Sequence, residues 1–355
     1  MRKKNNGELS GVKEIARRAQ VSIATVDRVL HNRPGVSVKT KAKIEAIIKE
    51  IDYKPNLLAR RLASRKVFKF AVLIPKESNE TEYWRGPLTG IQTAWSEIKV
   101  YGVEVSFFLY DLNNRDTFVQ EGDKLLEGGF HGVVVAPSFI EEAIDFVSKC
   151  KAKKIKCVFI NSDISNIQPL SYIGPDLFQS GRLAGNLCQY LVPKDGKVLI
   201  LNISRVVDAE HHLMRKADGF RSYFENERPD CSIDMLTVQK TDYESVISEV
   251  DKYLATARVD LLFVTNSRVF TVARYFAENK INNIKLVGYD YLEQNLKYLD
   301  AGIIDFLICQ KPVEQGYQAL LTLHQYFINE SESVEKMQLM PIDIITKENY
   351  KFYKN

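Results

Sequence analysis

From Phe70 onward the sequence alternates short apolar runs with longer amphipathic stretches, and this alternation constrains the fold more than any other feature. The apolar runs are residues 70–74, 103–109, 132–136, 157–160, 197–201, 233–238, 261–265, 286–289, 306–309 and, after a charged tail, 342–345. Most are rich in Val, Ile, Leu and Phe without alternating polar residues, which predicts parallel strands covered on both faces. Helical patterns fill the intervals, as in residues 84–99, 176–191 and 268–279. Repeated strand–helix units predict an α/β fold with doubly wound sheets.

This part of the chain, residues 67–355, is long enough to form two lobes with separate cores. We expect the chain to cross between the lobes near Ser171, Gln310 and Glu330. The first lobe would then comprise about residues 67–170 and 311–330, and the second about residues 171–310 and 331–355. In sheets of this kind, ligands bind outside the carboxyl ends of the strands.

The first 66 residues differ from the rest of the chain in charge. They contain 17 Lys or Arg and 6 Asp or Glu, a net charge of +11, whereas the whole chain carries +4. The remaining 289 residues therefore sum to −7. A small basic module joined to an acidic body predicts a head that binds a polyanion.

Three apolar patterns with helical spacing follow one another in this head. Their inward-facing residues are Val12, Ile15, Ala16 and Ala19, then Val26, Val29 and Leu30, then Ile44, Ile47, Ile48 and Ile51. Ser10, Ser22 and Ser37 are the expected N-caps, and residues 31–35, with Pro34 and Gly35, end the second helix. Two short helices braced by a third predict a helix-turn-helix. The alternative is a three-helix domain with no role on DNA.

Residues 12–30, 36–37 and 53–63 together resemble, without gaps, the head and hinge of LacI-family bacterial repressors. The resemblance implies a helix-turn-helix domain over residues 1–54 and a hinge over residues 55–66. It also implies that the protein binds operator DNA as a homodimer, with the second helix of each head in the major groove.

Residues at the start of the second helix would face the bases. Ile23 and Ala24 could contact thymine methyl groups, and Arg28 could bind a guanine edge through two hydrogen bonds. Further phosphate contacts are expected from hydroxyl groups near helix starts and, by resemblance, from two later residues: Ser22, Thr25, Ser37, Thr40, Tyr53 and Asn56. Asp27 stands where the family commonly has Ser. It could accept from cytosine, pair with Arg28 or Lys39, or point away.

The hinge, residues 55–64, is expected to form a short helix only on DNA, because so short a helix is marginal in water. By resemblance, Leu62 from each of two copies opens the central minor groove, at a cost of a few kcal/mol of unstacking. The alternative is an ordinary linker helix with Leu62 as filler.

The body resembles the periplasmic sugar-binding fold that LacI-family repressors share, and most closely its ribose-binding branch. Candidate ligand contacts stand where predicted strands end or match the family pattern: Tyr83, Trp84, Ser138, Asn161, Asp163, Arg215, Asn266, Asp290 and Gln310. Carboxylates and amides suit sugar hydroxyls, and an aromatic ring suits the apolar face of the sugar. Each of these residues could instead be a cap or loop residue.

Two positions depart from the sugar-binding pattern. Asn161-Ser162 stands where the pattern has Asp-Arg or Asp-Ser, and Lys216, beside Arg215, stands where it has Arg. The pocket could therefore hold an acidic sugar, or a set of hydroxyls that differs from that of ribose.

Other kinds of chemistry find little support. The five cysteines are scattered and mostly lie in apolar patterns, which predicts buried free thiols in a reducing compartment. His211 and His212 are adjacent and would point in different directions on a helix, which disfavours a metal site. The sequence contains no G-x-G-x-x-G, P-loop or G-x-S-x-G motif, no signal peptide and no membrane span, so we expect no cofactor and no membrane contact.

The expected function is a cytoplasmic, nucleoid-associated, dimeric repressor of a carbohydrate-utilisation operon that responds allosterically to a monosaccharide or derivative. Whether that effector acts as an inducer or as a corepressor stays open. Two alternatives are a stand-alone sugar-binding sensor and an enzyme with a DNA-binding appendage. Turnover of an added sugar would favour the enzyme, whereas thermal stabilisation without product would favour a sensor.

Overall fold

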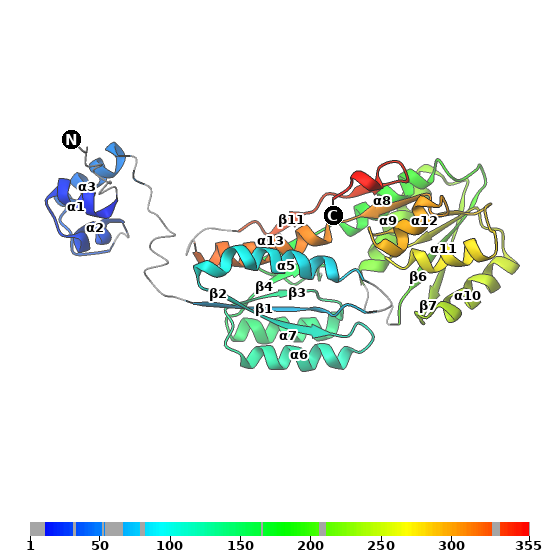
Figure 1. Ribbon diagram of the computed structural model, residues 1–355, viewed down its shortest axis with the longest axis horizontal. Coiled ribbons are helices and arrows are strands. Elements are labelled where there is room, and N and C mark those ends of the chain that lie inside the picture. Colours follow the sequence, from blue (N-terminus) through cyan, green and yellow to red (C-terminus); the bar gives the residue numbers. More distant parts are fainter. Residues whose placement is uncertain are drawn as a thin grey trace, which may run out of the picture. The chain divides into compact units, whose positions relative to one another are not determined.

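The computed structural model describes residues 11–30, 33–51, 53, 67–78, 82–164, 166–205, 211–328 and 334–354. The chain divides into two units, residues 1–65 and 66–355. Figure 1 shows the helical first unit and the α/β second unit. Each unit is described by itself below.

The first unit contains α1 (Val12–Ala19), α2 (Ile23–Leu30) and α3 (Val38–Glu50). Ile15, Val26 and Ile44 are fully buried and come from one helix each, so the three amphipathic faces share one core. Ser22 and Ser37 act as the predicted N-caps, and their Oγ atoms accept from the backbone N–H groups of Thr25 (3.1 Å) and Thr40 (3.2 Å). The N-cap position of α1 is Gly11, not the predicted Ser10, which lies outside the described residues.

The second unit contains two six-stranded sheets. The first has the order β11-β5-β4-β3-β1-β2 and its pairings are parallel: β1 (Phe68–Pro75), β2 (Val103–Tyr110), β3 (Gly132–Val135), β4 (Lys156–Ile160), β5 (Ser171–Gly174) and β11 (Met337–Leu339). Helices α5 (Arg85–Ile98) and α13 (Pro312–Ile328) cover one face, and α6 (Arg115–Glu127) and α7 (Ile140–Ala152) cover the other (Figure 1). The 3₁₀-helix η1 (Lys99–Tyr101) follows α5.

The second sheet repeats this plan with the order β12-β10-β9-β8-β6-β7: β6 (Lys197–Ile203), β7 (Ser232–Val238), β8 (Leu261–Val264), β9 (Lys285–Tyr289), β10 (Phe306–Cys309) and β12 (Asp343–Ile345). Only β12 runs antiparallel to its neighbour among these described strands. One face is covered by α8 (Leu177–Cys188) and α9 (His211–Glu227), and the other by α10 (Tyr243–Thr256), α11 (Val269–Glu278) and α12 (Glu293–Asp300). The 3₁₀-helix η3 (Tyr350–Phe352) lies near the end of the chain. The structure confirms the doubly wound α/β fold.

The crossings between the lobes differ in part from the prediction. The chain passes from β10 in the second sheet to α13 on the first between Cys309 and Pro312, around Gln310. However, β5 and β11 both belong to the first sheet, so the other two crossings follow Gly174, three residues after Ser171, and Leu339, nine residues after Glu330. Glu330 itself lies outside the described residues. Neither strand has an apolar run long enough to be recognised in the sequence.

Helices α5 and α13 pack backbone to backbone, as do α8 and α9. A Cβ atom on Gly90 would lie 1.9 Å from the carbonyl oxygen of Val313, and one on Gly181 would lie 2.0 Å from that of Lys216. Glycine is therefore required on α5 and α8 for the approach of the neighbouring helix. Since α9 carries Lys216, this approach also fixes the position of that residue.

Candidate ligand pocket and nucleic-acid interface

The exposed face of α2 carries the residues predicted to meet the bases. Ile23, Ala24 and Arg28 are exposed, whereas Val26 and Val29 turn into the core. Ile23 is 50% exposed although it is a large apolar residue. Ser22 and Ser37 are exposed, and Thr25 and Thr40 are half-buried. The structure thus places these four hydroxyl residues at or near the amino ends of α2 and α3, where backbone N–H groups favour phosphate.

Asp27 has a partner that the sequence did not suggest. Its Oδ2 accepts from Nη1 of Arg33 at 3.3 Å, on the chain that leaves α2. Both side chains are largely exposed, so the pair contributes little to stability. This contact gives the Asp27 carboxylate a partner within the protein, so its presence on α2 does not require a hydrogen bond from a cytosine base.

Of the remaining residues predicted to contact DNA, only Tyr53 lies within the described residues. Tyr53 is half-buried and packs against the core of the head. Asn56, Leu62 and the predicted hinge, residues 55–64, lie outside the described residues. Their roles stay predictions.

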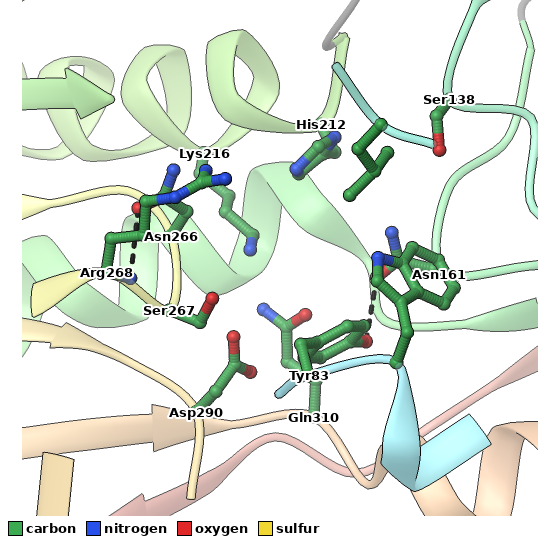
Figure 2. A pocket seen from close by; sticks show the side chains of 12 residues that line it. Tyr83, Ser138, Asn161, His212, Lys216, Asn266, Ser267, Arg268, Asp290 and Gln310 are labelled. Carbon is green, nitrogen blue, oxygen red and sulfur yellow. Dashed lines mark hydrogen bonds between the residues drawn. The ribbon is translucent and has the colours of Figure 1, made fainter. Parts of the chain in front are cut away.

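A pocket lies at the carboxyl ends of the strands of both sheets (Figure 2). Its first-lobe residues follow β1 to β4 along the chain: Tyr83, Trp84, Leu112, Ser138 and Asn161. Its second-lobe residues follow β6, β8, β9 and β10: His212, Lys216, Asn266, Ser267, Arg268, Asp290 and Gln310. The structure therefore brings together seven of the nine predicted ligand contacts. Asp163 and Arg215 do not line the pocket.

Two lining residues occupy equivalent positions in the two lobes. Asn161 follows β4 and Asp290 follows β9, the third strand in the order of each sheet. Both have left-handed backbone conformations, with φ of 68° for Asn161 and 76° for Asp290. Non-glycine residues adopt this conformation at a cost of about 1–3 kcal/mol, and such strain concentrates at functional sites.

A chain of hydrogen bonds fixes the first-lobe side of the pocket. The hydroxyl of Tyr83 donates to Oδ1 of Asn161 at 2.8 Å (Figure 2). The backbone N–H of Asn161 donates to Oε1 of Gln315 at 3.0 Å, and Nε2 of Gln315 donates to the carbonyl of Gln310 at 2.7 Å. Gln315 on α13 thereby links a pocket residue of one lobe to a pocket residue of the other.

Hydrogen bonds also fix the loop after β8. Nδ2 of Asn266 donates to the carbonyl of Ile203 at 2.8 Å, and the backbone N–H of Arg268 donates to Oδ1 of Asn266 at 3.2 Å (Figure 2). Nη1 of Arg268 also donates to the carbonyl of Ile203 at 3.2 Å. The side chains of this loop are buried, and these hydrogen bonds fix the orientation of Asn266 and Arg268.

Asp290 and Gln310 offer buried polar atoms to the pocket. Oδ1 of Asp290 and Nε2 of Gln310 have no hydrogen-bond partner among the described residues, and both side chains point into the pocket (Figure 2). Burial raises the pKa of Asp290 from 3.8 to about 6, and nearby Lys216 opposes this rise. Buried polar atoms without partners are costly, and an acceptor beside a donor suits ligand hydroxyl groups.

Lys216 lies on the pocket side of α9, whereas Arg215 does not. The ammonium of Lys216 is 3.9 Å from the centre of the Tyr289 ring and the residue is buried, while the guanidinium of Arg215 lies over Phe178. Consecutive residues on a helix point about 100° apart, so only one can face the pocket. The pocket is therefore lined by Lys216, the residue after the predicted Arg215.

A tight turn precedes Asp163. The backbone N–H of Ser162 donates to the carbonyl of Ile160 at 2.8 Å, and the left-handed Asn161 lies between them. Asn161 lines the pocket, whereas Asp163, two residues later, does not. Strand-end placement alone could not predict this turn.

Comparison with known proteins identifies both parts of the chain. A model described as the periplasmic binding protein domain matches residues 70–331, and a model described as bacterial regulatory proteins, lacI family, matches residues 11–56. Because the first model covers more than half of the chain, the chain belongs to the periplasmic binding protein domain family, and its head is similar to the lacI family over the matched residues. The matches to curated relatives are shorter than the chain itself.

The HTH-type transcriptional regulator RegA of Clostridium acetobutylicum is 42% identical over 71 residues, 20% of this chain and 21% of that protein. Catabolite control protein A of Staphylococcus xylosus is 41% identical over 185 residues, 52% of each chain. The chain thus spans about a fifth and about half of these two proteins. A solved structure from Bacteroides fragilis, described as a LacI transcriptional regulator, is 27% identical with a TM-score of 0.73 and covers 81% of this chain and all of that one.

Five pocket residues were not predicted as ligand contacts: Leu112, His212, Lys216, Ser267 and Arg268. Ser267 and Arg268 directly follow the predicted Asn266, and Lys216 follows Arg215, so the segments were identified but not every residue in them. Leu112 carries no polar signal in the sequence.

Three further features of the described part of the chain concern its cysteines, metal binding and membrane-spanning helices. The five cysteines form no disulfide, and four of them are buried. Within that part, no three His, Cys, Asp or Glu side chains gather where they could bind a metal ion. Also within it, every helix is too short or too polar to cross a membrane.

Proposed function

We propose that this protein is a DNA-binding transcriptional repressor of the lacI type that regulates carbohydrate-utilisation genes and is controlled by a small sugar or sugar derivative bound in the pocket. One observation carries the proposal: a single chain joins a lacI-type head, matched over residues 11–56, to a pocket lined by polar side chains from two lobes.

The head supports operator binding through its charge and its exposed helix. The net charge of +11 over residues 1–66 supplies the attraction to phosphates that dominates affinity for DNA. Ile23, Ala24 and Arg28 on the exposed face of α2 would read bases in the major groove. A single helix-turn-helix covers only half of a site, so we propose a homodimer on a palindromic operator in the cytoplasm.

The pocket supports a carbohydrate effector through its polar groups. Asp290, Asn161 and Gln310 provide acceptors and donors for hydroxyl groups, and the edge-to-face pair of Tyr83 and Trp84, with ring centres 5.2 Å apart, provides an aromatic wall. Lys216 and Arg268 also line the pocket, so sugar acids and sugar phosphates belong among the candidates together with neutral monosaccharides.

Control of DNA binding would follow from linkage between the pocket and the head. A ligand that contacts both lobes favours one arrangement of the lobes, and the hinges transmit this preference to the spacing of the two heads. Coupling of this kind is typically ~1–3 kcal/mol and is reciprocal. An inducer and a corepressor differ only in which arrangement binds the operator.

Selection of binding sites from a random pool of duplexes tests the proposal. The full-length protein is expected to enrich a palindrome, and Arg28→Ala is expected to lose about 1–3 kcal/mol of discrimination at one base position in each half-site. The reason is that Arg28 is exposed on α2 and can donate two hydrogen bonds to one guanine.

Lys49→Ala is the matched control, because Lys49 is an exposed cation at the end of α3. It should lower affinity evenly across sequences. Failure to enrich any sequence would remove the proposed function, and an unchanged base preference in Arg28→Ala would remove Arg28 from the base-reading set.

A further inference from the structure

The segment that follows β12 packs against the loops after β9 and β10. Nδ2 of Asn349 donates to the carbonyl of Ile344 at 2.9 Å and closes the turn that leaves β12. The hydroxyl of Tyr350 donates to Oδ1 of Asp300 at 2.7 Å, and the hydroxyl of Tyr291 donates to the carbonyl of Tyr350 at 2.9 Å. These contacts anchor residues 346–354 to the second lobe.

Tyr353 in this segment contacts two residues from different loops. The centres of the Tyr353 and Tyr291 rings are 5.0 Å apart. The ammonium of Lys311 lies 4.2 Å from the centre of the Tyr353 ring, and the same nitrogen lies 3.1 Å from the Asp343 carboxylate and donates to the carbonyl of Lys354 at 2.9 Å. Tyr353 thus joins the β9 loop to the β10 loop without lining the pocket.

Both of these contacts lie one residue beyond a pocket residue. Tyr291 follows Asp290, and Lys311 follows Gln310. Asp290 and Lys311 both have left-handed backbone conformations, with φ of 76° and 52°. Such conformations persist only where the surrounding structure enforces them. The contacts of Tyr353 fall on the two turns that need this support.

We propose that Tyr353 is a positioning residue for effector binding: it holds the two turns that direct the Asp290 carboxylate and the Gln310 amide into the pocket. This inference rests on the proposed function of the pocket. Tyr353 acts through Tyr291 and Lys311, and the chain crosses to the first lobe directly after Lys311. The C-terminal segment therefore sets both the pocket geometry and the start of that crossing.

Amide hydrogen exchange in the full chain tests the proposal without a ligand. The N–H groups of Asp290, Leu292 and Gln315 donate to the carbonyls of Ile308, Asp290 and Lys311 at 2.9, 3.1 and 3.0 Å. Tyr353→Ala is expected to speed exchange at these amides by about tenfold while leaving the amides of β1 unchanged. Uniformly faster exchange would show general destabilisation, and unchanged exchange at the two turns would show that Tyr353 does not hold them; either result overturns the proposal.

Two matched variants separate the ring contacts from other effects. Tyr353→Phe keeps the ring beside Tyr291 and Lys311 and should restore wild-type exchange. Phe352→Ala removes a neighbouring aromatic ring that is 84% exposed, and should change nothing. If Tyr353→Ala does not fold, Lys311→Met removes the charged partner of the ring and should speed exchange at the β10 turn; unchanged exchange there would contradict the proposal.

Binding of D-ribose, D-gluconate and D-glucose 6-phosphate gives the second readout. For the probe that binds wild type most tightly, Tyr353→Ala should raise Kd by about tenfold, because small displacements of binding groups weaken recognition strongly. An unchanged Kd in Tyr353→Ala, with Asp290→Asn losing binding, would overturn the positioning role and leave the proposed function intact. Binding of none of the three probes would count against the sugar effector, and the exchange result would then decide the role of Tyr353.

Discussion

Asp290→Asn is expected to make the protein more stable at pH 7.5 and at the same time unable to respond to its effector. The carboxylate is buried, and its pKa is raised from 3.8 to about 6. Ionising it at neutral pH therefore costs the folded state on the order of 3 kcal/mol. An amide of similar shape avoids this cost, but it changes the acceptor that the pocket offers to ligand hydroxyls.

The stability difference should depend on pH with a definite sign. Because the pKa in the folded state lies above that of the unfolded chain, the neutral carboxyl stabilises the fold fully below pH 3.8. This contribution is lost as pH rises through about 6. The advantage of Asp290→Asn over wild type should therefore be small at pH 4 and grow toward pH 7.5.

Urea unfolding at several pH values, with a thermal-shift titration of the effector, measures both effects. Asp163→Asn is the control, because Asp163 is a nearby carboxylate that does not line the pocket. It should keep the wild-type response to the effector. An Asp290→Asn protein that still binds the effector normally would remove Asp290 from the ligand-binding set.

Gly181→Ala is expected to lower both the stability of the second lobe and the affinity for the effector. Its Cβ atom would lie 2.0 Å from the carbonyl oxygen of Lys216, a backbone atom that cannot move without displacing α9. Overpacking of this kind costs about 1–3 kcal/mol or more. Because Lys216 lines the pocket, a displacement of about 1 Å could weaken binding about 100-fold.

Gly122→Ala on α6 is the matched control, because its Cβ would meet side chains and no backbone atom: the ring of Phe146 at 3.0 Å and Cδ2 of Leu73 at 3.9 Å. A ring can turn aside, so unfolding free energy should change little and effector affinity should not change. Equal losses of affinity in the two variants would show that the contact between α8 and α9 does not position the pocket.

The sequence predicted most of the fold because buried parallel strands are continuous apolar runs. The run at residues 306–309 became β10 with the same bounds, and residues 12–19 became α1. Two strands were not predicted from the sequence. The strand Ser171–Gly174 is short and begins with a polar residue, and the strand Met337–Leu339 has three residues, lies at the edge of the sheet and is largely exposed. Both form strands through pairing with neighbours that are distant in the sequence.

The pocket was predictable where a polar residue directly ends a strand, as Asp290 and Gln310 do. Lys216 lines the pocket and Arg215 does not, because the phase of α9 directs consecutive residues to different sides, and residue types do not specify this phase. Asp163 stands two residues after Asn161 and does not line the pocket either. The contact of Tyr353 with two pocket loops depends on the path of the C-terminal segment. No sequence motif indicates this path.

Affinity for the selected operator, measured by fluorescence anisotropy with and without saturating effector, tests the central claim most directly. The account predicts a change of about 5- to 150-fold in either direction, and an equal change in effector affinity when operator is bound. Operator affinity that stays the same at effector concentrations shown by thermal shift to fill the pocket would contradict the claim that the pocket controls the head.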